Sequence, residues 1–280
     1  MKKNDRTVMI IKLVLLSVFA VAVLYPLAWM IGSSFKPEAT IFKDLGVIPK
    51  QFTVENYFIG WKANGRTSFS VFFRNSLFIS ILCVIGNLLS CVLTAYPFAR
   101  LRFRGQNIMF ALMMMTLMIP QHATIVPQYV YFYKLGWIDT FLPMIIPKFL
   151  ATDTFFIYMV MQFIRGIPRE LDEAAIVDGC SVYSVFTRII LPLTRSALVT
   201  TTIFTFMWSW NDFFTQLIYL RSAPKYTVTL GLRMFVDSTA KSAFGAMFAM
   251  STLSIVPMLI LFVLFQRQLV EGIATSGLKG

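Results

Sequence analysis

The sequence has few of the side chains that build metal sites, disulfide scaffolds and catalytic centres. Its 280 residues include three cysteines and one histidine, with no C-x-x-C pair and no Cys/His ligand spacing. Structural zinc and a disulfide framework are therefore not expected. The phosphate-binding loop G-x-x-x-x-G-K-S/T and the nucleophile elbow G-x-S-x-G are also missing. We expect no cofactor, no bound metal and no catalysis by this chain alone.

Charged residues are also scarce. They make up 14% of the chain, whereas hydrophobic residues make up 57%. A soluble domain is typically about half apolar and about a quarter charged, so this composition indicates a membrane protein. The net charge of +12 does not predict nucleic acid binding, because the basic residues are scattered between apolar segments. Basic residues that flank apolar segments are instead typical of membrane proteins.

Six apolar segments are long enough to cross the lipid bilayer, which takes about 20 residues. They are continuous, without the alternating pattern of membrane barrels, so we expect an all-α membrane protein with six transmembrane helices. The first segment is too long for a signal-peptide core and no A-x-A site follows it, so we interpret it as an uncleaved span. The segments lie near residues 13–34, 76–99, 107–133, 140–164, 197–220 and 243–265.

Basic residues near the ends of the spans predict the orientation. Their density, although not their raw total, places the N-terminus and the second and fourth loops in the cytoplasm, and six spans return the C-terminus there. The sequence thus divides into a cytoplasmic tail (1–12), a first transmembrane helix (13–34), an extracytoplasmic loop (35–75), a five-helix core (76–267) and a cytoplasmic tail (268–280). The fourth loop, residues 165–196, belongs to the core.

Three of the expected spans contain polar or helix-breaking residues. In the third, Pro120 and Pro127 enclose a polar stretch, which predicts either a kinked packing helix or a broken helix that lines a pathway. In the fifth, "WSWNDFF" (208–214) is either an interfacial anchor or polar lining. The candidate residues of a translocation path are Gln121, Gln128, Asp153, Asn211 and Asp212.

The fourth span contains Lys148 and Asp153, just after Pro147. A helix that began after Asp153 would be too short to span, so we expect at least one of the two charges at membrane depth. Each charge costs about 2.5–3.5 kcal/mol there and should face a cavity or a partner. On a continuous helix, residues five apart point about 140° away from each other, so a direct pair is not expected. The alternative is that Lys148 extends outward to the interface.

The fourth loop contains a charged stretch, "RELDEAAIVDGCSVYSVFTRIILPL" (169–193). Acidic residues in its first turn complement a helix dipole, and alanines on one arc of this helix would allow another surface to approach closely. Gly179 permits a sharp change of direction, and Ser181 can cap a second helix that runs toward the next span. A short helix, a bend and a second helix that leads to the next span are suited to transmitting a movement into the membrane.

The pattern Glu173-Ala174-Ala175-x-x-Asp178-Gly179, followed by Phe186 and Leu191-Pro192-Leu193, resembles the EAA loop of ABC importer permeases. The segments "RNSLFIS" (74–80), "AYPFARLRFRG" (95–105), "QFIRGIPRELDEAA" (162–175), "WSWNDFF" and "GLKG" (277–280) are similar to the smaller subunit of maltose-type carbohydrate permeases. Cys180 and Ser196 depart from the family pattern, which usually has Ala and Pro there.

The resemblance implies the type I ABC importer permease fold, with the EAA loop as a cytoplasmic coupling helix in a bacterial cell membrane. It also implies four kinds of partner: the lipid bilayer, a second permease subunit, two cytoplasmic ATPase subunits and an external solute-binding protein. In this family the EAA helix docks in a groove of the ATPase, and Glu173 would meet a basic residue there. The candidate coupling residues are Glu170, Glu173, Ala174, Ala175, Asp178 and Gly179.

The cargo implied by the resemblance is a mono-, di- or oligosaccharide. An importer of glycerol-3-phosphate or another polar solute is the nearest alternative, and such an anionic cargo would favour basic groups such as Lys148 in the route. A secondary transporter driven by ions is a further alternative, but it would have paired broken helices in two repeats, which the sequence does not show. A membrane enzyme or passive scaffold would not account for the EAA loop.

Overall fold

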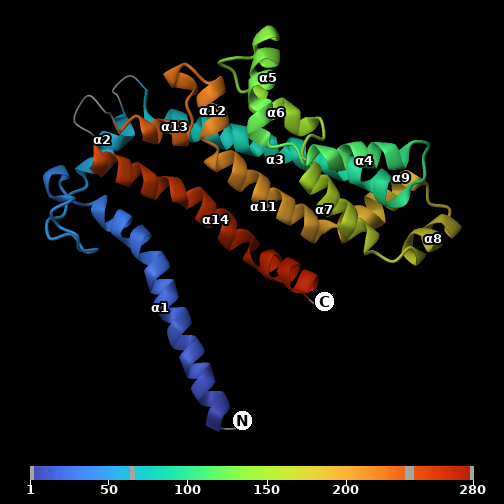
Figure 1. The fold of residues 1–280 in the computed structure, drawn as a ribbon, viewed down its shortest axis with the longest axis horizontal. Coiled ribbons are helices and arrows are strands. Elements are labelled where there is room, and N and C mark those ends of the chain that lie inside the picture. The colour runs from blue at the N-terminus through green and yellow to red at the C-terminus, as the bar shows by residue number, and fades with distance from the viewer. Residues whose placement is uncertain (1–2, 64–66, 237–242, 278–280) are drawn as a thin grey trace. The chain divides into compact units, whose positions relative to one another are not determined.

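The computed structural model describes residues 3–63, 67–236 and 243–277, and within these residues the only regular secondary structure is helical (Figure 1). Side chains are described for all of them except 3–7, 121 and 267–277. The expected all-α class is thus confirmed. The chain divides into two compact units, one formed by Met1–Ser70 and Gly231–Val256 and the other by Val71–Leu230 and Pro257–Gly280.

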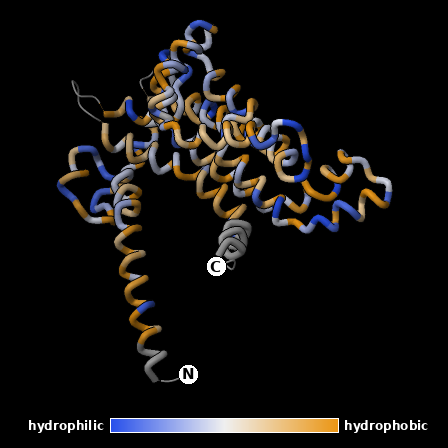
Figure 2. The backbone as a smooth tube through the Cα atoms, turned by 45° about the vertical axis from the view of Figure 1, so that its right-hand side comes forward, coloured by the Kyte–Doolittle hydropathy of each residue, from blue (hydrophilic) through white to orange (hydrophobic). Residues whose placement is uncertain are grey.

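The first unit contains a long apolar helix and the loop that follows it. Figure 2 shows α1 as an almost unbroken run of hydrophobic residues, and side chains such as Leu16 and Phe19 are 67% and 70% exposed. The loop is fastened by the buried Lys36, which donates hydrogen bonds to the backbone oxygens of Asp44 and Gly46, each over 2.6 Å. The helices of this unit are α1 (Lys3–Ser33), η1 (Glu38–Thr40), α2 (Glu55–Lys62) and the first part of α14 (Phe244–Gly277).

The second unit is built around α3, against which the later helices pack. Its larger core cluster joins α3 to α7 and to the segment that carries the EAA motif, through residues such as Tyr96, Ile164 and Phe186. The elements are α3 (Phe69–Arg100), α4 (Gln106–Thr116), α5 (Gln121–Lys134), α6 (Leu142–Phe149), α7 (Thr154–Arg165), α8 (Glu170–Val177), α9 (Val182–Val185), the π-helical η2 (Phe186–Ile190), α10 (Leu191–Leu193), α11 (Arg195–Asn211), α12 (Phe214–Tyr219), η3 (Ala223–Lys225) and α13 (Val228–Arg233).

The six expected spans are not all continuous helices. Among the described residues, four segments are long and apolar enough to cross a membrane: Val8–Ser33, Phe69–Arg100, Leu142–Arg165 and Phe244–Gln266. A fifth results if Val182–Leu193 and Arg195–Asn211, which meet at 68°, form one broken span. The expected span at 107–133 is instead divided into α4 and α5, and the one at 197–220 into α11 and α12.

Proline explains the break between α4 and α5. Pro120 precedes the first residue of α5 with a φ of −59° and a ψ of 126°, an extended conformation that ends regular hydrogen bonding, whereas Pro127 lies inside α5. The break between α6 and α7 has another cause. There the chain passes through Ala151, whose φ is +56°, a left-handed conformation that no helix can contain. Both breaks lie where the sequence predicts irregular spans.

Candidate functional site

A cavity of about 840 Å³ lies within the second unit, between α3 and the broken helix pairs. Four of the five residues that the sequence assigns to a translocation path line it: Gln128, Asp153, Asn211 and Asp212. The side chain of the fifth, Gln121, lies outside the described residues. The breaks in the helices therefore bring polar groups from distant parts of the sequence to one cavity.

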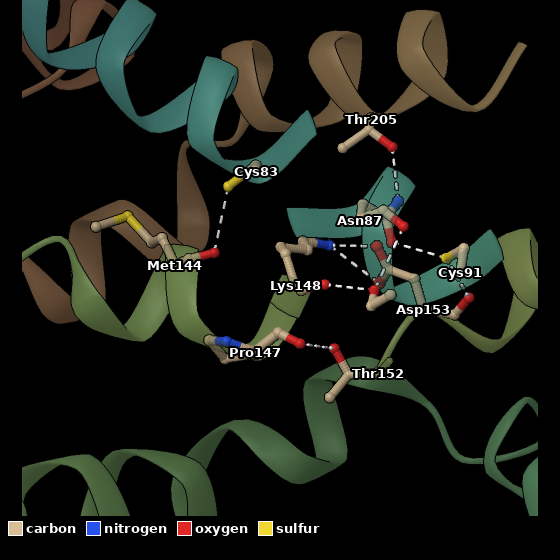
Figure 3. Close-up of polar contacts among 10 residues, drawn as sticks. Cys83, Asn87, Cys91, Met144, Pro147, Lys148, Thr152, Asp153 and Thr205 are labelled. Carbon is tan, nitrogen blue, oxygen red and sulfur yellow. Dashed lines mark hydrogen bonds and ion pairs between the residues drawn. The ribbon is translucent and has the colours of Figure 1, made fainter. Parts of the chain in front are cut away.

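Lys148 and Asp153 form an ion pair at the wall of this cavity (Figure 3), with Nζ 2.7 Å from Oδ2 and 3.0 Å from Oδ1. The expectation that the two side chains would not meet is wrong. It assumed a continuous helix, but α6 ends at Phe149 and the left-handed turn at Ala151 folds the chain back. The Lys148 side chain is 28% exposed and that of Asp153 is 21% exposed, so each charge is neutralised at the cavity surface.

Helix α3 supplies the polar contacts behind this pair. Ser90 Oγ donates to the backbone oxygen of Lys148 over 2.7 Å, which satisfies a carbonyl at the end of α6. Asn87 Nδ2 donates to Thr205 Oγ1 over 2.7 Å, and the thiol of Cys91 lies 3.0 Å from Asn87 Oδ1 (Figure 3). Because these buried polar groups are paired, α3, α6 and α11 keep a defined spacing around the cavity.

One position of α3, Gly86, has no room for a side chain. An added Cβ on Gly86 would lie 2.5 Å from the ring of Phe149, closer than real contacts allow. Glycine at position 86 therefore lets the α6–α7 break pack directly against α3. A larger residue would push the Lys148–Asp153 pair away from its polar contacts.

The far side of the cavity is formed by the break between α11 and α12. Asn211 Nδ2 donates to the Met207 oxygen over 3.0 Å, and Asp212 Oδ1 accepts from the backbone nitrogen of Thr215 over 3.1 Å. Asp212 thus binds a backbone N–H in the first turn of α12. Gln216 is 1% exposed and accepts hydrogen bonds from Thr227 and Thr229. The sequence identifies Asn211 and Asp212 but misses Gln216, which has no distinctive neighbours in the chain.

The lining combines hydrogen-bonding groups with aromatic rings, among them Trp208 and Tyr219. The acidic and basic side chains of this lining are one lysine, Lys148, and two aspartates, Asp153 and Asp212. Among the described residues, no group of three or more His, Cys, Asp or Glu is placed to hold a metal ion. The cavity is therefore suited to a neutral polar molecule that has both hydroxyl groups and apolar faces.

A second candidate region is the charged segment at one end of the unit, where α8 and α9 lie (Figure 1). Glu173, Ala174 and Asp178 are exposed, and Val177 beside them is 87% exposed. Ala175, in contrast, is 7% exposed and packs in the core cluster with α3 and α7. Helix α8 thus presents Glu170, Glu173, Ala174 and Val177 to the outside and uses Ala175 for its own attachment.

The bend after α8 has the geometry that the sequence predicts. Gly179 has a φ of +82°, its N–H donates to the Ile176 oxygen over 3.0 Å, and the N–H of Cys180 donates to the Ala175 oxygen over 2.9 Å. This pair of bonds is a Schellman motif, in which glycine is favoured because it adopts positive φ without strain. Ser181 Oγ then accepts from the Ser184 nitrogen over 3.2 Å, which confirms the expected cap of the second helix.

Two residues of α3 fasten this segment, and the sequence does not predict this role for either of them. Arg100 Nε lies 2.9 Å from Asp172 Oδ2, with the arginine side chain 4% exposed, and Arg100 Nη2 donates to the Ile167 oxygen over 2.8 Å. One turn earlier, Tyr96 packs on Phe186 with ring centroids 4.8 Å apart. The signal in the sequence is the i, i+4 spacing of Tyr96 and Arg100, which places them on one face of α3.

Asp139 fastens the opposite part of the same unit, outside the candidate spans. It accepts hydrogen bonds from the Arg221 and Ser222 nitrogens over 2.9 and 3.0 Å, and Lys225 Nζ lies 3.1 Å from its carboxylate. Burial raises the pKa of Asp139, but the hydrogen bonds from Ser222 and the Arg221 backbone, together with Lys225, outweigh it and hold the pKa well below the ordinary 3.8. The link between α5 and α6 is thereby joined to residues 221–225.

Comparison with known proteins identifies the family. Residues 86–274 match the family described as "Binding-protein-dependent transport system inner membrane component". The chain is 32% identical to a probable ABC transporter permease protein of Bacillus subtilis, over 95% of this chain and 87% of that protein. It is also 32% identical to the arabinooligosaccharides transport system permease protein of Halalkalibacterium halodurans, over 91% of each chain.

The fold is shared with a solved structure, that of a bacterial ABC transporter involved in the import of the acidic polysaccharide alginate. The TM-score is 0.84, with 23% sequence identity over 95% of this chain and 98% of that chain. The EAA segment (169–193) and all of the cavity-lining residues except Ile79 and Cys83 fall within the residues that match the family. The chain therefore belongs to the family of inner membrane components of binding-protein-dependent transport systems, and it is a permease of an ABC importer.

Proposed function

We propose that this chain and a second permease subunit together form the route by which a bacterial importer moves a neutral carbohydrate across the cytoplasmic membrane. The observation that carries the proposal is the cavity, in which four residues expected along a path lie together with aromatic rings and a neutralised ion pair. Sugars offer many hydroxyl groups and apolar ring faces, and this lining matches both. The match to a relative named for arabinooligosaccharide transport supports the same class of cargo.

An anionic cargo such as glycerol-3-phosphate is less well supported. It would need free cationic groups in the route, but Lys148 is paired with Asp153 and is the only lysine or arginine among the described residues that line the cavity. The second carboxylate, Asp212, adds negative charge that would repel an anion. A neutral solute would not be repelled by this carboxylate.

The energy would come from ATPase subunits that bind the exposed face of α8. Glu170, Glu173, Ala174 and Asp178 are free to contact another protein, and Arg100 connects this helix to the membrane core. A push on α8 would therefore pass directly into α3 and α7. Two ATPase subunits would hydrolyse ATP and an external binding protein would deliver the solute, so this chain would itself be non-catalytic.

The membrane arrangement completes the proposal. The expected division of the chain remains a prediction, with six spans if α4 with α5 and α11 with α12 each count as one broken span. Both termini and residues 165–196 would lie in the cytoplasm. Labelling of cysteines introduced at position 4 and in the exposed link at 35–55 with a membrane-impermeant maleimide would check this, since only the second position should react in intact cells.

Uptake measurements with designed variants test the cargo. The complex that co-purifies with this chain would be placed in liposomes, and uptake of labelled neutral oligosaccharides and of glycerol-3-phosphate would be compared. Lys148→Gln combined with Asp153→Asn removes both charges and preserves the shape of the pair, so uptake of a neutral sugar should persist. Lys148→Gln alone leaves a carboxylate without its partner and should reduce uptake. Transport of glycerol-3-phosphate but of no sugar would overturn the proposal.

A further inference from the structure

A second cavity, of about 300 Å³, lies where α3 and α7 end and is lined mainly by arginines. Four of its eight lining residues are arginine, one is glutamine and none is a carboxylate. The lining residues are Phe98, Ala99, Arg100, Leu101, Arg102, Gln106, Arg165 and Arg169. We call this the arginine pocket. Four like charges around so small a space repel one another unless an anion or water screens them.

Two of these arginines have internal partners. Arg100 is paired with Asp172 and donates to the Ile167 oxygen, as described above. Arg165 Nη2 donates to the Phe98 oxygen over 3.2 Å, and its guanidinium lies 5.9 Å from the ring centre of Phe110. These two side chains bind backbone oxygens at the ends of α3 and α7, which are otherwise without helical partners. Structural roles therefore account for two of the four positive charges of the pocket.

The other two arginines have no such role. Arg102 and Arg169 are exposed, and their side chains form no hydrogen bond or ion pair within the part of the chain that the structure describes. They come from different segments, one from the link after α3 and the other from the link after α7. Among the residues that the structure describes, Asp172 is the one carboxylate that forms an ion pair with a pocket arginine, and that arginine is Arg100. The arginine pocket thus retains a positive charge that the described residues of the chain do not neutralise.

The position of the pocket identifies the anion that is available to it. Helix α3, at 32 residues, is about 48 Å long and ends at Arg100, while the candidate span Leu142–Arg165 ends at Arg165. Because the apolar layer of a bilayer is about 30 Å thick, the end of so long a helix reaches the layer of lipid headgroups. Guanidinium groups bind phosphate oxygens in a bidentate manner, and basic pockets between spans hold anionic headgroups.

An apolar surface begins directly beside the pocket. Gln106, the first residue of α4, lines the pocket, and the outward side chains of the same helix are strongly exposed. Ile108, Met109, Leu112 and Met115 are 69%, 55%, 58% and 60% exposed. A free phosphate ion would not cover this apolar surface, whereas the acyl chains of a lipid would. We propose that the arginine pocket binds the phosphate headgroup of an anionic phospholipid, with the acyl chains lying along α4.

Such a lipid would connect the link after α3 to the link that leads into α8, because Arg102 and Arg169 would bind one headgroup. It would thereby stabilise the attachment of α8 to α3 that Arg100 provides. The proposal does not depend on which solute the importer carries, so it can fail while the proposed function stands.

The test uses the full-length chain in detergent and measures lipid binding by native mass spectrometry, with phosphatidylglycerol and phosphatidylcholine as probes. The variant Arg102→Gln/Arg169→Gln removes the two unpaired charges. Its matched control, Arg104→Gln/Arg188→Gln, removes two exposed arginines outside the pocket. We expect preferential binding of phosphatidylglycerol, and each arginine contributes about fivefold to affinity, so the pocket variant should bind about 25-fold more weakly.

Three outcomes would overturn the proposal. The first is equal binding of the two lipids, and the second is an equal loss of binding in the pocket variant and in the control. The third is displacement of the lipid by inorganic phosphate at a similar concentration, which would indicate a site for free anions. Arg102 and Arg169 are exposed, so both variants should fold, and thermal unfolding with and without phosphatidylglycerol gives a second readout. Only the pocket variant should lose the rise in melting temperature that this lipid causes.

Discussion

Helix α3 supports two regions that use polar residues in opposite ways. At its end, Arg100 and Tyr96 fasten a segment in which Glu170, Glu173 and Asp178 are exposed and available to another protein. Further back, Asn87 and Ser90 help to form a cavity whose polar side chains point inward and bind one another. The outward region is assembled largely from neighbouring residues, and the inward region from seven helices between α3 and α12. Helix α3 therefore fastens the segment on which an ATPase would act, and it also forms part of the wall of the cavity.

The largest effect is expected at the outward region. Glu173→Lys should abolish transport and weaken association with the ATPase, because it reverses the charge of an exposed carboxylate without touching the core. Uptake assays and co-purification from membranes would measure both. Glu55→Lys, another exposed acidic residue near the start of a helix, is the control and should have little effect. Full uptake in Glu173→Lys would show that the ATPase does not use this face.

Removing the cation of the buried ion pair should have the next largest effect. Arg100→Met leaves Asp172 and the Ile167 oxygen without their partner and should cost about 3–5 kcal/mol in the free energy of unfolding. Denaturation in detergent would measure this cost. Adding Asp172→Asn should recover part of the loss, because an amide carries no charge to leave uncompensated. Strictly additive losses in the double variant would mean that the pair does not fasten α8.

The equivalent change in the inward region should have a smaller effect. Lys148→Met removes the partner of Asp153, but both side chains are partly exposed to the cavity, so the expected cost is about 1–3 kcal/mol. The exchanged pair, Lys148→Asp with Asp153→Lys, should restore most of the stability. A loss as large as that of Arg100→Met would contradict the difference in burial between the two regions.

Gly179 should show a modest effect on stability and a clear effect on coupling. Gly179→Val forces a β-branched residue into positive φ, which costs about 1–2 kcal/mol and should shift the bend. ATP hydrolysis by the assembled complex should then continue with reduced transport. Gly179→Asn is the matched control, because asparagine tolerates this conformation and no atom lies within 4 Å of the added Cβ. Normal coupling in the valine variant would show that the bend is not needed.

The smallest effect concerns pH and Asp139. Its pKa is lowered in the folded chain, so its contribution to stability is complete above the ordinary value of 3.8 and is lost as the pH falls further, toward the folded pKa. The melting temperature should therefore decrease below about pH 4 more in the natural chain than in Asp139→Asn. Parallel curves for the two proteins would show that Asp139 makes no such contribution.

The outward region could be predicted from sequence because its determinants are local. Positive φ at Gly179 and the cap at Ser181 depend on a few adjacent residues, and both are confirmed. Its attachment could not be predicted, because Arg100 and Asp172 are far apart in the chain and nothing in the local pattern pairs them. Nor could the burial of Ala175, since the arc of alanines does not show which side faces the core.

The inward region illustrates the limits of helical periodicity. The polar residues are identifiable because each is unusual in an apolar segment, and four of them do line one cavity. Whether Lys148 meets Asp153 depends on a non-helical turn at Ala151, a residue with no preference for positive φ. Tertiary packing against Gly86 and Ser90 stabilises that turn, and this information is absent from the local sequence.

Cysteine cross-linking along α8 tests the central claim, that an ATPase binds the outward face of this helix. Cysteines would be introduced one at a time as Glu173→Cys, Ala174→Cys and Ala175→Cys in a chain with Cys180→Ala, since Cys83 and Cys91 are buried. A short bifunctional maleimide would then be applied to membranes that contain the whole importer. Positions 173 and 174 should cross-link to the ATPase, and the buried position 175 should not. Cross-linking at position 175 alone, or at none of the three, would contradict the account.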